Sequence, residues 1–405
     1  MEEEPAAKRR RKESKKQLLV NNGDIYTPPR LIPPTYIAAD ATTVPKPPGF
    51  LPSTEVQVQG NEDPASKISV FATDDYAYSK RGYRFSPAIA RPSMSALKFT
   101  ACEAPPYCAR LSYEDRSPQS LLISQSGTVA STLHGFRSAR ANVCVREGDW
   151  YYEVKVLKGI PKDSDGANSH LHDAHVRLGF SRRESSMEAP VGHDGYGYGL
   201  RDVSGQTVHV SRPKPFMEES ICTGDIIGLR ISIPSRPEET KPVAGFFRDR
   251  YPVRYKGQLF FETLDYVPTK PMTELLTPVS VLRKKREGAK HHTPTTIPGS
   301  FITLYKNGKD MGQAFTDLNE FLPPHSKFQS PFDNRLFDDG MVGYYPTVSV
   351  YREGAVEVNF GPNFAHPPPD GVRPLCERYD EQIAEDLTLD IIDQVDFERL
   401  DQLKG

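Results

Sequence analysis

The chain has 405 residues, of which 37% are hydrophobic, and a mean hydropathy of −0.55. The hydrophobic residues are sufficient to fill a core, but we expect much of the chain to lie outside it. A net charge of −2 excludes a nucleic-acid-like bias for the whole molecule. Five scattered cysteines exclude a secreted disulfide framework and the usual zinc knuckle. With no apolar run of ~18 residues and no apolar N-terminal segment, we expect a soluble intracellular protein without a membrane span or a signal peptide. From the cysteine spacing we also expect no metal site.

The first sixty residues are predicted to be a disordered tail, because prolines and charges dominate them. A basic cluster near the start is typical of a nuclear import signal or a nucleic-acid contact, with a merely solvated charge run as the alternative. The cluster consists of Lys8, Arg9, Arg10, Arg11 and Lys12.

Residues 61–97 are predicted to be an extended arm that leads into the folded region. The arm carries a second basic patch, which either contacts a phosphate backbone or belongs to an ordered surface arm. The patch contains Lys80, Arg81 and Arg84.

Residues 98–374 indicate an all-β domain of two stacked antiparallel sheets, because no long helical pattern separates the strands. The expected strands are rich in aromatic and β-branched residues, and several alternate apolar with polar residues. They cover residues 150–157, 175–180, 225–233, 301–305, 343–350 and 355–360. Asn307-Gly308, directly after the run 301–305, predicts a tight hairpin into a following strand, since both turn residues need a positive φ.

A proline-rich, charged insertion of about residues 234–299 interrupts the series of predicted strands. Such a long segment inside a compact sandwich is either functional or disordered. It holds a third basic segment with possible DNA contact, formed by Arg283, Lys284, Lys285 and Arg286.

Residues 375–405 are predicted to form an acidic amphipathic helix. Its apolar stripe either docks on its own domain or fits a groove on a partner, and we expect the sandwich to fold without it. The stripe consists of Ile383, Leu387, Ile391, Ile392 and Val395.

Five motifs in chain order resemble those of SPRY domains. They begin at Gly148-Asp-Trp150, Val176-Arg177, Gly224-Asp-Ile-Ile-Gly228, Tyr305-Lys-Asn-Gly308 and Tyr345-Pro346. The insertion, the Leu111–Arg116 segment and the acidic helix are similar to the SPRY subunit of COMPASS, the SET-domain histone H3 lysine methyltransferase complex, in its short fungal, Bre-two-like form.

This resemblance implies a nuclear, non-catalytic scaffold and activator. Its partners would be a SET-domain subunit, β-propeller subunits, a Dpy-30-type dimer bound by the helix, and the nucleosome or DNA. It also implies that an acidic segment of a β-propeller subunit binds the SPRY domain, where guanidinium groups suit carboxylates. The positions that match this pocket are Phe136, Arg177, Pro190, His193 and Arg201, and Phe136 and His193 stand where the resemblance implies tyrosines. Arg140 is a further candidate for binding the acidic segment, because its guanidinium group can bind a carboxylate. The alternative for Arg177 is an internal ion pair.

Catalysis has no support in the sequence, because no nucleophile motif is present and Gly195–Gly199 lacks the strand-to-helix context of a phosphate loop. We therefore expect no enzyme activity, no cofactor and no small-molecule substrate. The main alternative function is a SPRY substrate receptor for a ubiquitin ligase, although no RING element is visible. A nucleic-acid-binding protein that uses only its basic segments is the third.

Overall fold

The computed structural model describes residues 44–59, 67–74, 83–90, 97, 99–118, 120–162, 174–237, 248, 250–277, 292–322 and 338–404. Most of the basic residues singled out above lie outside these ranges. They are Lys8, Arg9, Arg10, Arg11, Lys12, Lys80, Arg81, Arg283, Lys284, Lys285 and Arg286. Among the described residues, no helix is both long enough and apolar enough to cross a lipid bilayer.

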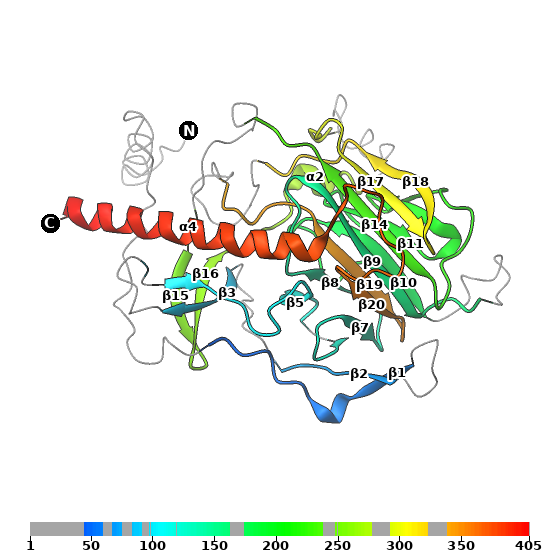
Figure 1. The fold of residues 1–405 in the computed structure, drawn as a ribbon, viewed down its shortest axis with the longest axis horizontal. Coiled ribbons are helices and arrows are strands. Elements are labelled where there is room, and N and C mark those ends of the chain that lie inside the picture. The colour runs from blue at the N-terminus through cyan, green and yellow to red at the C-terminus, as the bar shows by residue number, and fades with distance from the viewer. Residues whose placement is uncertain are drawn as a thin grey trace, which may run out of the picture. The chain divides into compact units, whose positions relative to one another are not determined.

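Two antiparallel sheets form a sandwich, which confirms the all-β prediction (Figure 1). The seven-stranded sheet runs in the order β13 (Arg212–Lys214), β12 (Gln206–His209), β11 (Gly197–Arg201), β10 (His175–Ser181), β19 (Tyr345–Tyr351), β8 (Arg137–Ala141) and β5 (Leu111–Arg116). The eight-stranded sheet runs in the order β18 (Lys309–Thr316), β17 (Phe301–Lys306), β14 (Ile226–Ile233), β9 (Gly148–Lys158), β20 (Ala355–Asn359), β7 (Val129–Thr132) and β6 (Leu121–Ile123). The short β21 (Arg373–Pro374) adds to β9 in parallel.

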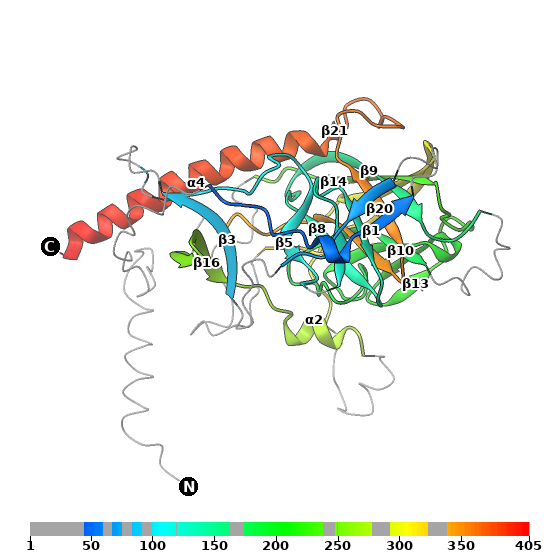
Figure 2. The same ribbon diagram turned by 90° about the horizontal axis from the view of Figure 1, so that it is seen from below.

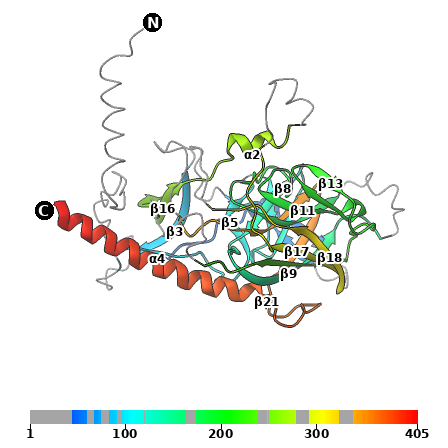
Figure 3. The same cartoon turned by 90° about the horizontal axis from the view of Figure 1, so that it is seen from above.

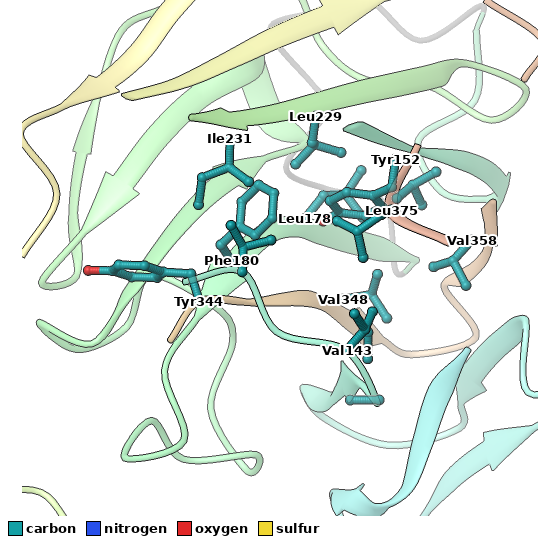
Figure 4. Packing of buried hydrophobic residues seen from close by; sticks show 14 of the residues in the cluster. Val143, Tyr152, Leu178, Phe180, Leu229, Ile231, Tyr344, Val348, Val358 and Leu375 are labelled. Carbon is teal, nitrogen blue, oxygen red and sulfur yellow. The ribbon is translucent and has the colours of Figure 1, made fainter. Parts of the chain in front are cut away.

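The core lies between the inner faces of the two sheets. Because side chains alternate along a strand, Leu178 and Phe180 of β10 point inward and meet Leu229 and Ile231 of β14 in one buried cluster (Figure 4). The same alternation turns Arg177 to the outer face of the seven-stranded sheet. The predicted hairpin is also present, since Asn307 and Gly308 take φ values of 49° and 78° between β17 and β18.

The insertion contains secondary structure and contributes two strands to a four-stranded sheet that is separate from the two sheets of the sandwich. Its strands β15 (Arg250–Tyr255) and β16 (Gln258–Leu264) form a hairpin, and β16 pairs with β3 (Tyr83–Ala90), which pairs with β4 (Phe99–Ala101). The extended arm predicted for residues 61–97 therefore contains a long strand. Its pairing partner lies about 170 residues further along the chain, so no local pattern could reveal it.

The tail predicted to be disordered over residues 1–60 is ordered from residue 44 in the described part. A 3-10 helix, η2 (Pro52–Thr54), precedes β1 (Val56–Gln59), which pairs with β2 (Lys67–Val70). Val58 and Val70 pack against Leu122 and Leu157 of the sandwich, so apolar burial orders this hairpin. The period-two pattern of the hairpin was hidden by the neighbouring prolines.

In the described ranges, two α-helices flank the sandwich. The short α2 (Lys270–Glu274) lies within the insertion, after its two strands, and the 30-residue α4 (Leu375–Lys404) is the predicted C-terminal helix. The two helices lie on opposite sides of the sandwich (Figure 2, Figure 3). Helix α4 continues past the sandwich to run beside the four-stranded sheet, where it contacts β4 (Figure 1).

Candidate functional site

Two arginines face each other on the outer face of the seven-stranded sheet. Arg177 of β10 is directly opposite Arg201 of β11 in the strand register. Arg177 donates to the Val191 carbonyl at 3.4 Å, and Arg201 donates to Oε1 of Gln206 at 3.1 Å. Neither guanidinium forms an ion pair with a carboxylate in the described part of the chain, so the internal pair that was the alternative for Arg177 is not found there.

Aromatic rings border this pair of arginines. The Arg177 guanidinium lies 5.3 Å from the centre of the Phe136 ring, and the Phe136 and Tyr351 rings are 4.9 Å apart. Tyr351 was not among the binding residues predicted from the sequence. The period-two rule could have found it, because Tyr351 shares a face of β19 with Ser349, the residue opposite Arg177. We call the group of Phe136, Arg177, Pro190, His193, Arg201 and Tyr351 the Arg177 cluster.

The electrostatic environment of Arg177 favours an anion. Burial, followed by the like charge of Arg201, lowers the pKa of Arg177 to about 10. The group therefore stays charged at neutral pH, but its charge is poorly compensated, and its buried Nε has no hydrogen-bond partner among the described residues. A carboxylate or phosphate placed between the two guanidinium groups would offset both costs.

The segment of residues 187–193 lies across the outer face of the same sheet, where Pro190 and His193 stand on either side of Val191 in the sequence, and the Val191 carbonyl accepts from Arg177. Val191 N donates to Ser349 Oγ at 2.9 Å, and His193 N donates to the Pro190 carbonyl at 3.0 Å. A Cβ at Gly199 would lie 2.4 Å from the Val191 carbonyl oxygen. Close approach of the two backbones therefore requires glycine at position 199, so packing accounts for Gly199.

Two of the predicted binding arginines are not on this surface. Arg140 is buried and bonds Asp115 in a bidentate manner, with Nε–Oδ2 at 2.9 Å and Nη2–Oδ1 at 2.8 Å, while its other donors reach backbone carbonyls of residues 182–185. Arg84, predicted to contact DNA, also points to Asp115, at 3.6 Å. Since both guanidinium groups serve the interior, we remove Arg140 and Arg84 from the predicted binding residues.

Helix α4 is anchored to its own domain along one face. Leu375 and Tyr379 belong to the main core, and the Tyr379 hydroxyl donates to Glu103 at 2.9 Å. Gln382 bridges the backbone on both sides of Val143, as it accepts from Cys144 N and donates to the Asn142 carbonyl. The expectation that the sandwich is independent of this helix is therefore not supported, because the first turns of α4 complete the core.

The apolar stripe of α4 lies outside that anchored face. Its five side chains are all between 41% and 49% exposed, which is unusual for large aliphatic residues in a folded domain. They are Ile383, Leu387, Ile391, Ile392 and Val395. The helix thus docks on its own domain through one face and presents an uncovered apolar face beside it.

The described residues give no basis for metal chemistry. No group of three or more His, Cys, Asp or Glu side chains that could hold a metal ion occurs among them. All five cysteines are free thiols. His291 lies outside the described residues and His292 is exposed.

Comparisons with known proteins agree with the resemblance found in the sequence. No protein-family model matches the chain. The chain is 42% identical over 376 residues to the Set1 complex component ash2 of Schizosaccharomyces pombe, covering 91% of this chain and 52% of that protein. It is 40% identical to the COMPASS component cclA of Colletotrichum higginsianum, covering 87% and 74%, and 26% identical to the COMPASS component BRE2 of Saccharomyces cerevisiae, covering 82% and 90%.

The chain therefore spans about half the length of the fission-yeast relative and about three quarters of the Colletotrichum one. A crystal structure of a human SPRY domain aligns with 61% of this chain at 12% identity and a TM-score of 0.32, which is too low to support an argument about the fold. Identity of 40% over most of both chains is sufficient for the family assignment. This chain belongs to the family of the COMPASS components ash2, cclA and BRE2.

Proposed function

We propose that this chain is a non-catalytic, nuclear scaffold and activator subunit of a COMPASS-type complex in which a separate SET-domain subunit methylates histone H3 lysine. The names of its relatives support the assembly, because they are components of the Set1 complex or of COMPASS, and the Drosophila relative is a subunit of a Set1/Ash2 histone methyltransferase complex. On this proposal the chain holds its partners together and supplies no catalytic group itself.

The exposed stripe of α4 is the observation that carries the proposal. Five aliphatic side chains on one stretch of a well-anchored helix leave an apolar face in water, and a groove on a helical dimer would cover it. Burial of three or four such side chains is worth roughly 1.5–3 kcal/mol each before ordering costs, enough for a specific complex. We propose that the occupant of the stripe is a Dpy-30-type dimer.

The Arg177 cluster would bind the second partner. Its two guanidinium groups, which have no carboxylate partner among the described residues, and its aromatic border suit carboxylates on a flexible segment, so we propose that it receives an acidic segment of a β-propeller subunit. Phe136 and His193 stand where the resembled subunit has tyrosines. His193 still forms a polar contact, since its Nδ1 lies 3.0 Å from Ser211 Oγ.

The basic segments would contribute nuclear import or a weak contact with nucleosomal DNA. They comprise Lys8–Lys12, Lys80, Arg81 and Arg283–Arg286. If they neutralise phosphates, the logarithm of the affinity for DNA falls linearly with the logarithm of salt concentration. A gel shift that is unchanged after charge reversal of all three segments would remove this part of the proposal.

Reconstitution of methylation tests the proposed function. The purified chain alone is expected to show no methyltransferase activity and no binding of S-adenosylmethionine by calorimetry. Added to a SET-domain subunit and a β-propeller subunit, it is expected to raise the rate of histone H3 lysine methylation. An unchanged rate, with all three proteins folded, would contradict the scaffold role, and co-purification with ubiquitin-ligase subunits would favour the alternative.

A further inference from the structure

We infer that the insertion is a bracket for α4: Arg248 and Arg250 hold the second half of the helix in place and so present its apolar stripe to the partner. The inference deepens the proposed function, since it rests on the proposal that a dimeric partner covers the stripe. It assigns a positioning role to two residues of a segment that the sequence analysis left without one.

The contact is a compact group of two guanidinium groups and three carboxylates. Asp390 is 2% exposed and accepts from Arg248 at 2.8 Å, from Arg250, and from the backbone N of Ala101 at 2.8 Å. Asp393 lies 3.0 Å from Arg248 Nε and 2.8 Å from Arg250 Nη2. Thus β4 and the insertion, which are far apart in the sequence, meet α4 at one buried point.

Arg250 is itself fixed from the opposite side. Its guanidinium carbon lies 3.8 Å from the centre of the Phe261 ring on the neighbouring strand β16. The hairpin thus offers a preorganised cation, stacked on an aromatic face, to the acidic helix. Arg248 also lies 3.8 Å from Asp386, one turn before Asp390.

Apolar packing alone does not hold this half of the helix. Between residues 386 and 395, only Leu389, Asp390 and Gln394 are buried. The core anchors of α4 are in its first turns, and a helical segment as short as residues 386–395 is marginal in water without tertiary contacts. The two arginines therefore supply much of the fixation for residues 386–395, and removing them would leave Asp390 buried without its ionic partners.

The stripe lies within the same helical turns as the bracket. Leu387 follows Asp386, and Ile391 and Ile392 lie between Asp390 and Asp393. If the partner binds only the helical form of this segment, the apparent dissociation constant equals the intrinsic one divided by the fraction of molecules in which the segment is helical. A bracket that keeps the segment helical before binding therefore raises the apparent affinity.

The test combines amide hydrogen exchange with partner binding in the full-length chain. For the double variant Arg248→Ala/Arg250→Ala, amide exchange over residues 386–395 is expected to rise about ten-fold or more, with residues 375–382 unchanged. The affinity for a purified Dpy-30-type dimer is expected to fall about three- to ten-fold. Lys256→Ala, at the exposed tip of the same hairpin, is the matched control and should change neither quantity.

Each outcome decides a separate claim. Unchanged exchange over residues 386–395 overturns the bracket, and raised exchange with unchanged affinity overturns its role in presenting the stripe. If the double variant also raises exchange in β9 and β14, Asp393→Asn and the double variant Arg248→Lys/Arg250→Lys decide in its place. A wild-type chain that does not bind the dimer contradicts the proposed function, while the exchange data still test the bracket.

Discussion

The Arg177 cluster and helix α4 differ in which of their groups have partners within the chain. On the outer face of the sheet, Arg177 and Arg201 have no carboxylate partner within the part of the chain that the structure describes, while the Phe136 ring contacts both Arg177 and the Tyr351 ring. On α4 the charges at Asp390 and Asp393 are paired with arginines of the same chain, and aliphatic side chains are left uncovered. In each region, the group without an internal partner indicates the chemistry of the missing one, anionic for the cluster and apolar for the helix.

The largest expected effect separates the two faces of α4. Leu375 is fully buried in the core and Leu387 is 45% exposed, so the same substitution should have different costs. Leu375→Ala is expected to lower the free energy of unfolding by about 2–5 kcal/mol, and Leu387→Ala by no more than about 0.5 kcal/mol. Urea denaturation measures both, and equal losses would mean that the helix does not have one anchored and one free face.

At the Arg177 cluster we expect a loss of affinity without a loss of stability. Arg177→Ala or Arg201→Ala removes charged hydrogen bonds worth about 1.5–3 kcal/mol each, so binding of an acidic peptide should weaken ten-fold or more. Added salt should also weaken binding to the wild type. Full affinity in both folded variants, measured by calorimetry, would place the acidic-segment site elsewhere.

A smaller effect concerns pH at the root of the helix. Burial raises the pKa of Glu103, which accepts from Tyr379 of α4, to about 7, against the opposing influence of Arg110. The folded state therefore binds this proton more tightly than the unfolded chain does, so stability rises as pH falls from about 8 through 7 and levels off near 4.5.

Glu103→Gln isolates this group, because the amide keeps an acceptor for Tyr379 but cannot ionise. Between pH 8 and pH 5.5 the wild type should gain about 1–2 kcal/mol of unfolding free energy relative to the variant. Parallel stability curves for the two proteins over that range would show that Glu103 does not carry a raised pKa.

Local patterns were sufficient for six strands of the sandwich, β9, β10, β14, β17, β19 and β20, and failed for the parts built from distant segments. The strands around Trp150, Leu178 and Leu229 follow from alternation and β propensity, and the Asn307-Gly308 turn follows from its φ requirement. The four-stranded sheet could not be predicted, since the pairing of β3 with β16 joins segments about 170 residues apart in the sequence. Likewise, no local pattern around Arg140 predicts its buried ion pair with Asp115, which lies 25 residues earlier in the sequence.

The central claim is that two separate surfaces bind two chemically different partners. The direct measurement is calorimetry of three full-length proteins, the wild type, Leu387→Glu and the double variant Arg177→Ala/Arg201→Ala, each titrated with an acidic peptide and with a Dpy-30-type dimer. Leu387→Met serves as the apolar control and should bind both. We expect Leu387→Glu to lose the dimer and keep the peptide, because a carboxylate would be desolvated in an apolar groove, and the double variant to do the reverse. Loss of both partners in either folded variant, or of neither in both, would contradict the account.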